Sequence, residues 1–190
     1  MKIILGSQSK KRREILSEMG YEFDVMPSDF DELSVRSPVA WELPLLLARA
    51  KADTLLQKVT KPALLITSDT VVECNGNIIE KARDAEEVKH FYREYGKHPA
   101  EIITAVVVTN TETKKRVEGI DIARMQFSPV PEDIIDTLIE DGALFSWGGA
   151  FTIEEPLLQP YIERLEGTDD CVMGFPKTLA EQLIREAQMN

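Results

Sequence analysis

Hydrophobic positions recur with two different spacings along this chain. Some segments, such as residues 63–73, are almost continuously apolar, which is typical of buried strands. Others, such as residues 10–19, place apolar side chains on one face of a helix, here behind Ser9 as a cap. The pair Asn75 and Gly76 predicts a two-residue hairpin turn. The predicted strands are 2–6, 22–26, 63–73, 77–81, 101–110, 116–127 and 161–165, and the predicted helices are 10–19, 38–58, 84–95, 131–140 and a last one that begins around 176.

The order of these elements indicates the fold class. Strands and helices alternate over the first third of the chain, strands then dominate, and helices return at the end. This order is typical of an α/β or α+β protein, and we predict α/β, with a mixed, twisted sheet flanked by helices. A chain of 190 residues fits a single domain, residues 1–190, or two lobes around a central cleft.

Composition and charge narrow the class of protein. With 43% hydrophobic residues the chain can bury a sizeable core, whereas its longest apolar runs, such as 43–48 and 63–66, are too short to span a bilayer. Cys74 and Cys171 lack the spacing of a disulfide framework or a zinc site, which favours a reducing compartment. The net charge of -11 would repel a nucleic-acid backbone. We therefore expect a cytoplasmic protein that binds neither membranes nor nucleic-acid polymers.

Four consecutive cations, residues 10–13, contrast with this acidic chain. They occupy the predicted first turn of a helix, where each cation opposes the helix dipole at a cost of roughly 0.3–1 kcal/mol. A phosphate bound to the free backbone N–H groups of that turn would reverse the sign of this effect. The segment is therefore a candidate anion site. A solvated charged face explains the same run equally well, and no P-loop motif is present.

Asp69 interrupts the apolar strand predicted at 63–73. Burying an ionised carboxylate without partners is prohibitive, so Asp69 needs hydrogen-bond donors, a metal ion or an active-site cleft. The alternative is a place at a strand end, bonded to backbone amides. Glu32, Lys51 and Lys81 are candidate neighbours in a cleft, although ordinary surface charge also explains Glu32 and Lys51.

The predicted hairpin argues against a simple arrangement of Asp69 and Lys81. A regular hairpin around the Asn75–Gly76 turn pairs Thr70 with Lys81, which turns Lys81 to the face opposite Asp69. A bulge, or unpairing near the open end of the hairpin, is therefore needed to bring the two side chains together.

Several segments together resemble motifs of the Maf family, which belongs to the same fold group as the inosine triphosphate pyrophosphatases. The segments are 7–16 (SQSKKRREIL, similar to SxSPRRxELL), 31–32 (DE, an acidic pair), 47–52 (LARAKA, similar to LAxxKA), 68–72 (SDTVV, similar to ADTVV), 80–81 (EK, at the family's KP), 148–154 (GGAFTIE, similar to AGxYxIQ) and 167–176 (GTDDCVMGFP, similar to GxxxxVxGLP). They occur in the family's order across nearly the whole chain, so the set is specific where any single motif is not.

The resemblance implies hydrolysis of a nucleoside triphosphate to the monophosphate and pyrophosphate with a divalent cation, Mg²⁺ or Mn²⁺. Asp69 would accept the proton of the attacking water and, with Glu32, hold the metal. The residues that would bind the triphosphate are Ser7, Ser9, Lys11, Arg12, Lys51 and Lys81, and the two last would also be catalytic. This set is chemically sufficient, because phosphoryl transfer depends chiefly on positioning and charge stabilisation. The resemblance also suggests a homodimer.

Some positions depart from the family's pattern. Lys10 replaces a proline, and Lys11 replaces the first arginine of a pair, which keeps the charge but loses the bidentate fork. Ala82 replaces a second proline. Glu154 and Glu155 replace a Gln-Gly pair.

In this family three positions are associated with the choice of base, and they correspond to Lys11, Thr70 and Glu154. Thr70 resembles the branch that acts on dTTP and UTP, whereas Glu154 resembles the branch that acts on 7-methyl-GTP. A carboxylate only accepts hydrogen bonds, which suits the donor edge of guanine or the amino group of cytosine, and it favours a cationic methylated guanine. We expect a pyrimidine triphosphate (dTTP, UTP or CTP), because Thr70 lies beside Asp69.

Other functions remain as alternatives to a pyrimidine pyrophosphatase. One is a pyrophosphatase for 7-methyl-GTP or for inosine or xanthosine triphosphate. Another is a non-catalytic nucleotide-binding regulator of cell division, although pure binding does not require a general base. A metal-dependent phosphatase that releases orthophosphate is the last. The products released from a panel of nucleotides distinguish these alternatives.

Overall fold

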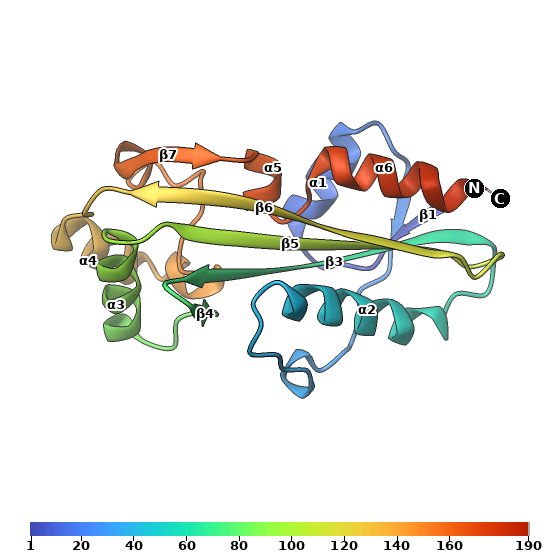
Figure 1. Ribbon diagram of the computed structural model, residues 1–190, viewed down its shortest axis with the longest axis horizontal. Helices are drawn as coiled ribbons and strands as arrows, with labels where there is room; N and C mark the ends of the chain where they lie inside the picture. The colour runs from blue at the N-terminus through green and yellow to red at the C-terminus, as the bar shows by residue number, and fades with distance from the viewer. Residues whose placement is uncertain (190) are drawn as a thin grey trace.

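A seven-stranded mixed sheet extends along the computed structural model, which describes residues 1–189 (Figure 1). The strands are β1 (Lys2–Leu5), β2 (Phe23–Val25), β3 (Ala63–Cys74), β4 (Asn77–Ile79), β5 (Ala100–Asn110), β6 (Arg116–Phe127) and β7 (Ile162–Glu166). The helices are α1 (Lys10–Glu18), α2 (Glu42–Leu56), α3 (Ala85–Tyr95), α4 (Glu132–Asp141), α5 (Asp169–Val172) and α6 (Lys177–Gln188), with 3₁₀ turns η1 (Glu32–Ser34), η2 (Ala143–Ser146) and η3 (Gln159–Tyr161).

The central strand β3 is paired along the whole of one edge and only in part along the other. The sheet order is β2-β1-β3-β5-β6-β7, with β1 parallel to β2 and β3 and the remaining neighbours antiparallel. On the edge opposite β5, strand β1 pairs with Ala63–Ile66 and β4 pairs with Val72–Cys74. Residues 67–71 on that edge therefore have no partner strand within residues 1–189, and we call this stretch the open edge of β3.

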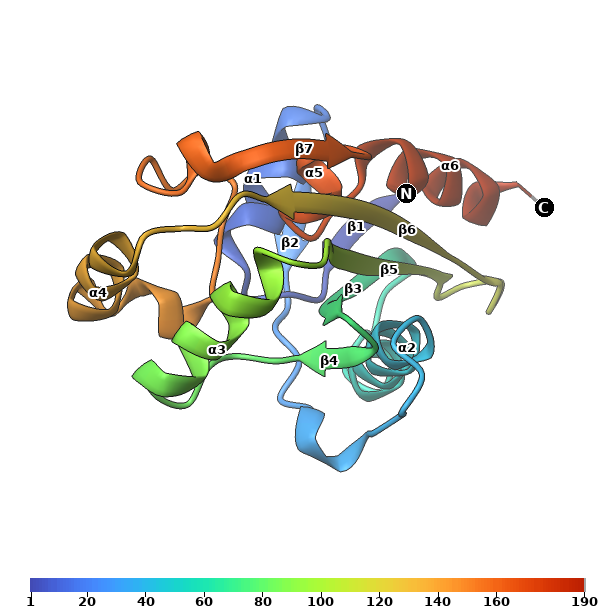
Figure 2. The same cartoon turned by 60° about the vertical axis from the view of Figure 1, so that its left-hand side comes forward.

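Side chains of β3 and β5 alternate between the two faces of the sheet. Helix α2 covers one face, where Leu65, Ala105 and Val107 belong to its core (Figure 2). The other face carries two separate apolar cores. One is formed with α1 and α6 around Leu64 and Ile66, and the other is formed with α3 and α4 at the opposite end of the long strands. Ser68, Thr70 and Thr104 lie between these two cores on the same face and form a polar band that divides the structure into the predicted two lobes.

The structure confirms the predicted order of strands and helices, with a few differences at the ends of elements. The helix predicted at 38–58 begins at Glu42, because residues 38–41 form a turn in which the Val39 carbonyl accepts from the Glu42 amide. The predicted strand 77–81 stops at Ile79. The short helix α5, capped by the Thr168 side chain, lies in a segment that the periodicity left unassigned.

None of the helices within residues 1–189 combines the length and apolar character needed to cross a membrane, and α2, with 15 residues, also carries several charges.

Candidate active site

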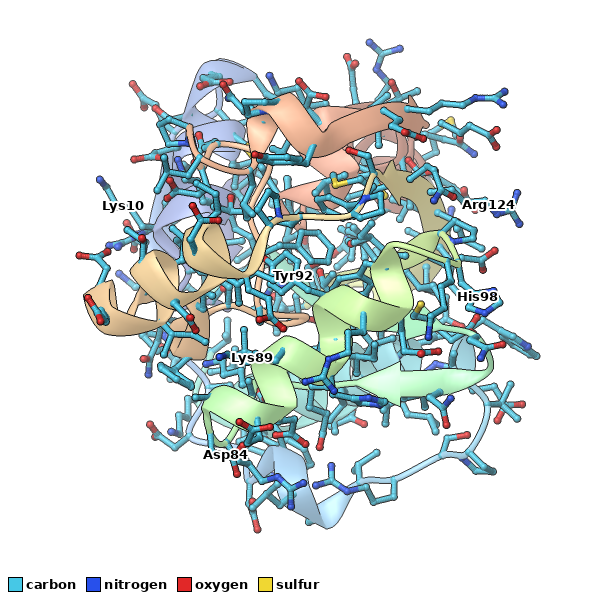
Figure 3. All side chains as sticks on the ribbon, turned by 90° about the vertical axis from the view of Figure 1, so that its left-hand side faces the viewer. Lys10, Asp84, Lys89, Tyr92, His98 and Arg124 are labelled. Carbon is cyan, nitrogen blue, oxygen red and sulfur yellow. The ribbon has the colours of Figure 1, made fainter. Side chains whose placement is uncertain are left out.

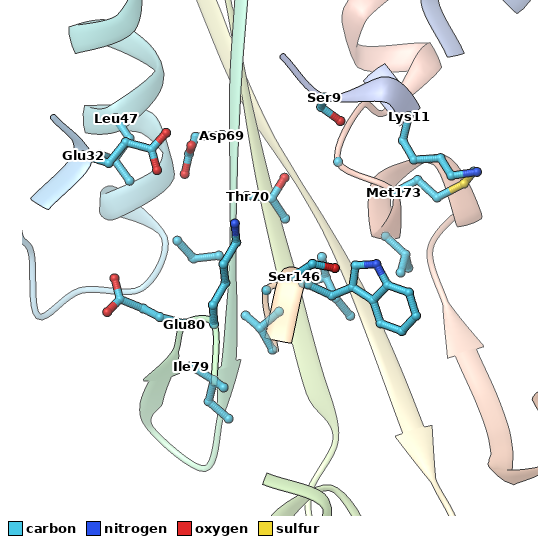
Figure 4. A pocket seen from close by; sticks show the side chains of 18 of the residues that line it. Ser9, Lys11, Glu32, Leu47, Asp69, Thr70, Ile79, Glu80, Ser146 and Met173 are labelled. Carbon is cyan, nitrogen blue, oxygen red and sulfur yellow. The ribbon is translucent and has the colours of Figure 1, made fainter. Parts of the chain in front are cut away.

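A cavity of about 810 Å³ lies at the open edge of β3. Because it surrounds this edge, the cavity receives side chains from both faces of the sheet. Figure 4 shows Glu32 and Asp69 on one side of β3, and Thr70 and Lys11 on the other. Neighbours along a strand can thus line the same cavity even though they point to opposite faces.

On the α2 face, Lys51 lies between two carboxylates. Its Nζ contacts Oδ1 of Asp69 and lies 2.7 Å from Oε1 of Glu32. Lys51 and Asp69 are both buried, whereas Glu32 at the start of η1 is largely exposed. Burial raises the pKa of Asp69, and the positive charges of Lys51 and Arg12 oppose that rise. Asp69 is therefore a carboxylate with increased basicity, held beside a cation.

Small residues explain how a lysine reaches this depth. Ala48 and Ala52, on either side of Lys51 along α2, are fully buried against the sheet. The Thr67 hydroxyl of β3 donates to the Ala48 carbonyl at 2.7 Å, which fixes the separation of α2 and β3. With no bulky side chain between the two elements, the Lys51 stem extends along the strand to Asp69.

The run of four cations divides into two pairs. Ser9 caps α1 by accepting from the backbone N–H of Arg12, as predicted. Lys11 and Arg12 line the cavity, whereas Lys10 and Arg13 lie over a separate shallow depression. Lys10 is exposed, with Nζ 3.4 Å from Glu14, and extends from the edge of the molecule (Figure 3). Lys10 therefore fits the solvated-face interpretation, whereas Lys11 and Arg12 lie where an anion in the cavity could meet them, and an anion site there stays a prediction.

Ser7 supports this turn from beneath. It is buried and is not among the residues that line the cavity, whereas Ser9 is. The Ser7 hydroxyl accepts from the Ser9 amide at 3.1 Å. Gly6 before it is required by space, because a Cβ there would lie 2.5 Å from Leu55 Cδ1 and 2.7 Å from Thr67 Cγ2.

Arg12 is engaged mainly with the walls of the cavity. Its Nε donates to the Gly174 carbonyl at 2.9 Å, and Nη1 donates to the Ser68 carbonyl at 2.8 Å and to the Ser7 hydroxyl at 3.5 Å. Nη2 donates to Thr70 Oγ1 at 3.2 Å. The Ser68 carbonyl lies on the open edge of β3, where no neighbouring strand can donate to it. The Arg12 guanidinium supplies this hydrogen bond instead. Within the described chain these contacts use four of the five N–H groups of a guanidinium.

Lys11 and Glu154 face each other across the cavity. Lys11 Nζ lies 2.7 Å from Oε1 and 2.6 Å from Oε2 of Glu154. The hydrogen bond to Glu154 raises the pKa of Lys11. Glu155 instead accepts from the Leu157 amide at 3.1 Å, away from the cavity. Of the two adjacent glutamates, Glu154 is therefore the one that a ligand would meet.

Lys81 reaches the cavity because the hairpin opens early. Strand β4 ends at Ile79, and Lys81 pairs instead with Gly148 in an isolated antiparallel bridge. This is the unpairing that a shared site with Asp69 required, and both residues line the cavity. Within residues 1–189 Lys81 forms no ion pair, so its ammonium group is available to a ligand.

Two buried tyrosines hold the loop that carries Gly148. The Tyr92 hydroxyl donates to the Ala150 carbonyl and the Tyr95 hydroxyl to the Gly149 carbonyl, each at 2.9 Å. Tyr92 belongs to α3 and is buried on the inner side of that helix (Figure 3). These bonds fix the backbone that leads into Phe151 and Glu154, both of which line the cavity.

Sequence reasoning assigned no role to Ser68, Thr104 or Gly174. Ser68 and Thr104 belong to the polar band and do not line the cavity, whereas Gly174 does. The Ser68 hydroxyl donates to the Gly174 carbonyl at 3.1 Å, and Thr104 Oγ1 lies 2.9 Å from Thr70 Oγ1. Thr104 could have been noticed in the sequence, because it is a polar residue inside the apolar strand β5. Its partner on the neighbouring strand became evident only from the register.

Glu32 and Asp69 suit a divalent cation that is shared with a substrate. Within the described residues no group of three or more His, Cys, Asp or Glu side chains could hold a metal by itself. Mg²⁺ in phosphoryl-transfer sites commonly takes one or two carboxylates and completes its shell with substrate phosphates and water. Both carboxylates contact Lys51 and lie at the cavity, so oxygen donors of the required hardness are available there.

The geometry combines a basic carboxylate, a second carboxylate and the cations of Lys11, Lys51 and Lys81 around one cavity. Such a set is able to bind a polyphosphate and to take a proton from water.

The chain is similar to known proteins over nearly its whole length. The family model described as Maf-like protein matches residues 2–187. A 7-methyl-GTP pyrophosphatase from Dictyostelium discoideum is 38% identical, with 97% of this chain and 96% of that protein covered. A nucleoside triphosphate pyrophosphatase from Synechococcus sp. (strain JA-3-3Ab) is 30% identical over 97% of this chain and 93% of that protein. A dTTP/UTP pyrophosphatase from Vibrio vulnificus is 28% identical over 97% of this chain and 98% of that protein.

The fold also resembles a solved structure of low sequence identity. A HAM1 protein from Coxiella burnetii superposes with a TM-score of 0.52 at 14% identity, and 98% of each chain is covered. This likeness confirms the expected fold group, a mixed α/β sheet with helices.

Proposed function

This chain belongs to the Maf family of nucleoside triphosphate pyrophosphatases, and from that premise we propose that it hydrolyses 7-methyl-GTP to 7-methyl-GMP and pyrophosphate. The observation that carries the choice of base is the position of Glu154. It lines the cavity, is paired with Lys11, and presents only hydrogen-bond acceptors. Guanine offers N1–H and N2–H donors on one edge, and methylation at N7 adds a positive charge that a carboxylate stabilises.

The expected pyrimidine substrate is supported less well than this alternative. That expectation rested on Thr70, whose hydroxyl is tied to Arg12 and Thr104. The relatives point the same way, since the 7-methyl-GTP pyrophosphatase is 38% identical and the dTTP/UTP enzymes from Vibrio vulnificus and Thermotoga petrophila are 28% and 30% identical. A pyrimidine triphosphate remains the second candidate, because those relatives also cover nearly the whole chain.

In the proposed reaction, water attacks the α-phosphorus and pyrophosphate leaves. Asp69 accepts the proton of that water, and its raised pKa suits it to this step. Lys51 holds the Asp69 carboxylate in place, and Lys11 and Lys81 neutralise phosphate charge from the two sides of the cavity. A divalent cation bound by Glu32, Asp69 and phosphate oxygens would add further charge neutralisation and increase the acidity of the water.

A nucleotide panel with both possible products assayed tests this function. The full chain is incubated with 7-methyl-GTP, GTP, dTTP, UTP, CTP or ITP in Mg²⁺ or Mn²⁺, and pyrophosphate and orthophosphate are measured. We expect pyrophosphate without orthophosphate and the highest kcat/KM for 7-methyl-GTP. Highest kcat/KM for a pyrimidine would refute the choice of base alone, whereas orthophosphate as the main product would place the attack at the γ position.

A pair of aspartate variants tests the proposed base. Asp69→Asn removes the proton acceptor and should lower kcat by about 10²–10⁴-fold. Asp53→Asn is the matched control, because Asp53 lies on the outer side of α2 and pairs with Arg116. Equal activities of the two variants would contradict the assigned role of Asp69.

A further inference from the structure

A chain of hydroxyl groups connects the cavity to helix α5. Arg12 Nη2 lies 3.2 Å from Thr70 Oγ1, which lies 2.9 Å from Thr104 Oγ1, which in turn lies 3.0 Å from the Cys171 carbonyl oxygen. Thr104 is fully buried and does not line the cavity, whereas Thr70 does.

The chemistry of the two ends determines the direction of every proton in this chain. A guanidinium only donates and a carbonyl only accepts, while each threonine hydroxyl has one proton and two lone pairs. Thr104 must give its proton to the Cys171 carbonyl, since two oxygens at 3.0 Å need a hydrogen between them. The proton between the two hydroxyls therefore comes from Thr70. The order is Arg12 to Thr70 to Thr104 to Cys171.

Gly174 restricts Thr70 from the other side. It has φ of +87°, and a Cβ placed on it would lie 2.9 Å from Thr70 Oγ1. The Gly174 amide donates a second hydrogen bond to the Cys171 carbonyl oxygen, at 3.0 Å. The Gly174 carbonyl accepts from Arg12. The segment after α5 is thus fixed to the same chain of hydrogen bonds.

We propose that Thr104 is a positioning residue that determines base specificity, because it takes the single proton of Thr70 and leaves Thr70 with one acceptor lone pair for the base. This inference rests on the proposed function, in which Glu154 contacts the base, and on the position of Thr70, which lines the same cavity. Both Thr70 and Glu154 then accept from the base and neither donates to it. A guanine edge can donate its N–H groups to both of these acceptors. A pyrimidine carbonyl would instead face a lone pair of one of them, and two acceptors repel each other.

Three variants separate a specificity role from a structural one. Thr104→Val keeps the shape but releases the Thr70 proton, so the ratio of kcat/KM for 7-methyl-GTP to that for UTP should fall at least tenfold. Thr104→Ser keeps the hydroxyl and should restore most of the ratio. Thr109→Val is the matched control, since Thr109 is buried on the same strand β5 and accepts from Arg116 Nε away from the cavity. Its ratio should equal that of the unaltered protein.

Equal losses for every nucleotide in Thr104→Val would reduce Thr104 to a structural residue and overturn the proposal. A change in the ratio would support it even if the unaltered protein preferred UTP, so failure of the proposed choice of base is recognised separately.

NMR of the nucleotide-free protein labelled with ¹³C at threonine tests the proton order without activity. The Thr70 hydroxyl proton should be protected from exchange with water in the unaltered protein and unprotected in Thr104→Val. A Thr70 proton that exchanges freely in the unaltered protein would overturn the proposal whatever the nucleotide panel shows, and whether or not Thr104→Val folds.

Discussion

Lys11 and Glu154 are 143 residues apart in the chain, yet the Lys11 ammonium lies 2.7 Å from the Glu154 carboxylate at the cavity. Their side chains are 40% and 47% exposed, so the pair adds little to the stability of the fold. Its main consequence is local. A charged donor and a charged acceptor lie together where a base would bind, and each orients the other.

Replacing Glu154 by glutamine should weaken discrimination for the methylated base. Glu154→Gln removes the negative charge and adds a donor, so we expect the ratio of kcat/KM for 7-methyl-GTP to that for GTP to fall by about tenfold, which corresponds to roughly 1.4 kcal/mol. Steady-state kinetics with the two nucleotides measures the ratio. Glu155→Gln is the control, because Glu155 contacts the Leu157 amide instead. A ratio unaltered in Glu154→Gln would show that Glu154 does not contact the base.

Removing Lys51 should move the pH dependence of the reaction in a definite direction. Activity requires ionised Asp69, so it falls as the pH drops through the pKa of this group. Burial raises that pKa and Lys51 lowers it, so in Lys51→Met the pKa rises further and the acidic limb of kcat/KM moves to higher pH. The measurement is a pH–rate profile, with Lys89→Met as control because Lys89 pairs with Asp136 between α3 and α4. A limb that moves to lower pH would contradict the assignment.

Two glycines with the same backbone conformation should respond differently to alanine. Gly142 and Gly174 both have positive φ, +77° and +87°, so either substitution should cost about 1–2 kcal/mol of stability in urea unfolding. Only at Gly174 does the new Cβ also meet Thr70 Oγ1, since nothing lies within 4 Å of a Cβ at Gly142. Gly174→Ala should therefore also change nucleotide preference. An unchanged nucleotide preference in Gly174→Ala would show that the polar band around Thr70 shifts to accommodate the new methyl group and is not rigid.

The two cysteines should react slowly in the folded protein. Burial raises the pKa of Cys74 to about 11 and that of Cys171 to about 12, so little thiolate exists at pH 8. Alkylation by iodoacetamide at pH 8, followed by mass spectrometry, should be much slower in buffer than in urea. Rapid native labelling would show that these regions open. The same assay reports whether Thr104→Val retains its packing, because Thr104 donates to the backbone carbonyl of Cys171 itself.

Local patterns predicted the elements that carry the site and the residues that need partners. Asp69 is unusual within a strand of apolar residues, and the cost of burying it predicted hydrogen-bond donors, a metal ion or a cleft, with Lys51 as one candidate neighbour. The Asn75–Gly76 turn gave the register of the hairpin correctly, because a two-residue turn determines which residues pair. The short range of these effects is why the sequence revealed them.

Long-range pairings decided what the sequence left open. Whether Lys81 reaches the cavity depended on its bridge to Gly148, and which of two glutamates faces Lys11 depended on the path of a loop held by Tyr92 and Tyr95. Thr104 meets Thr70 only because β5 pairs with β3 in one register. No periodicity of 2 or 3.6 residues contains such information.

The open edge of β3 has a consequence for how such proteins diverge. It lets consecutive residues of one strand, Asp69 and Thr70, line one cavity from opposite faces of the sheet. Within residues 1–189, Lys11, Thr104 and Glu154 form no hydrogen bond or ion pair with Lys51, Asp69 or Glu32, so we expect mutations on the Thr70 face to leave the contacts of Lys51 intact. Related proteins could then change their nucleotide substrate while they keep one hydrolytic reaction. The relatives of this chain named for 7-methyl-GTP and for dTTP and UTP accord with this.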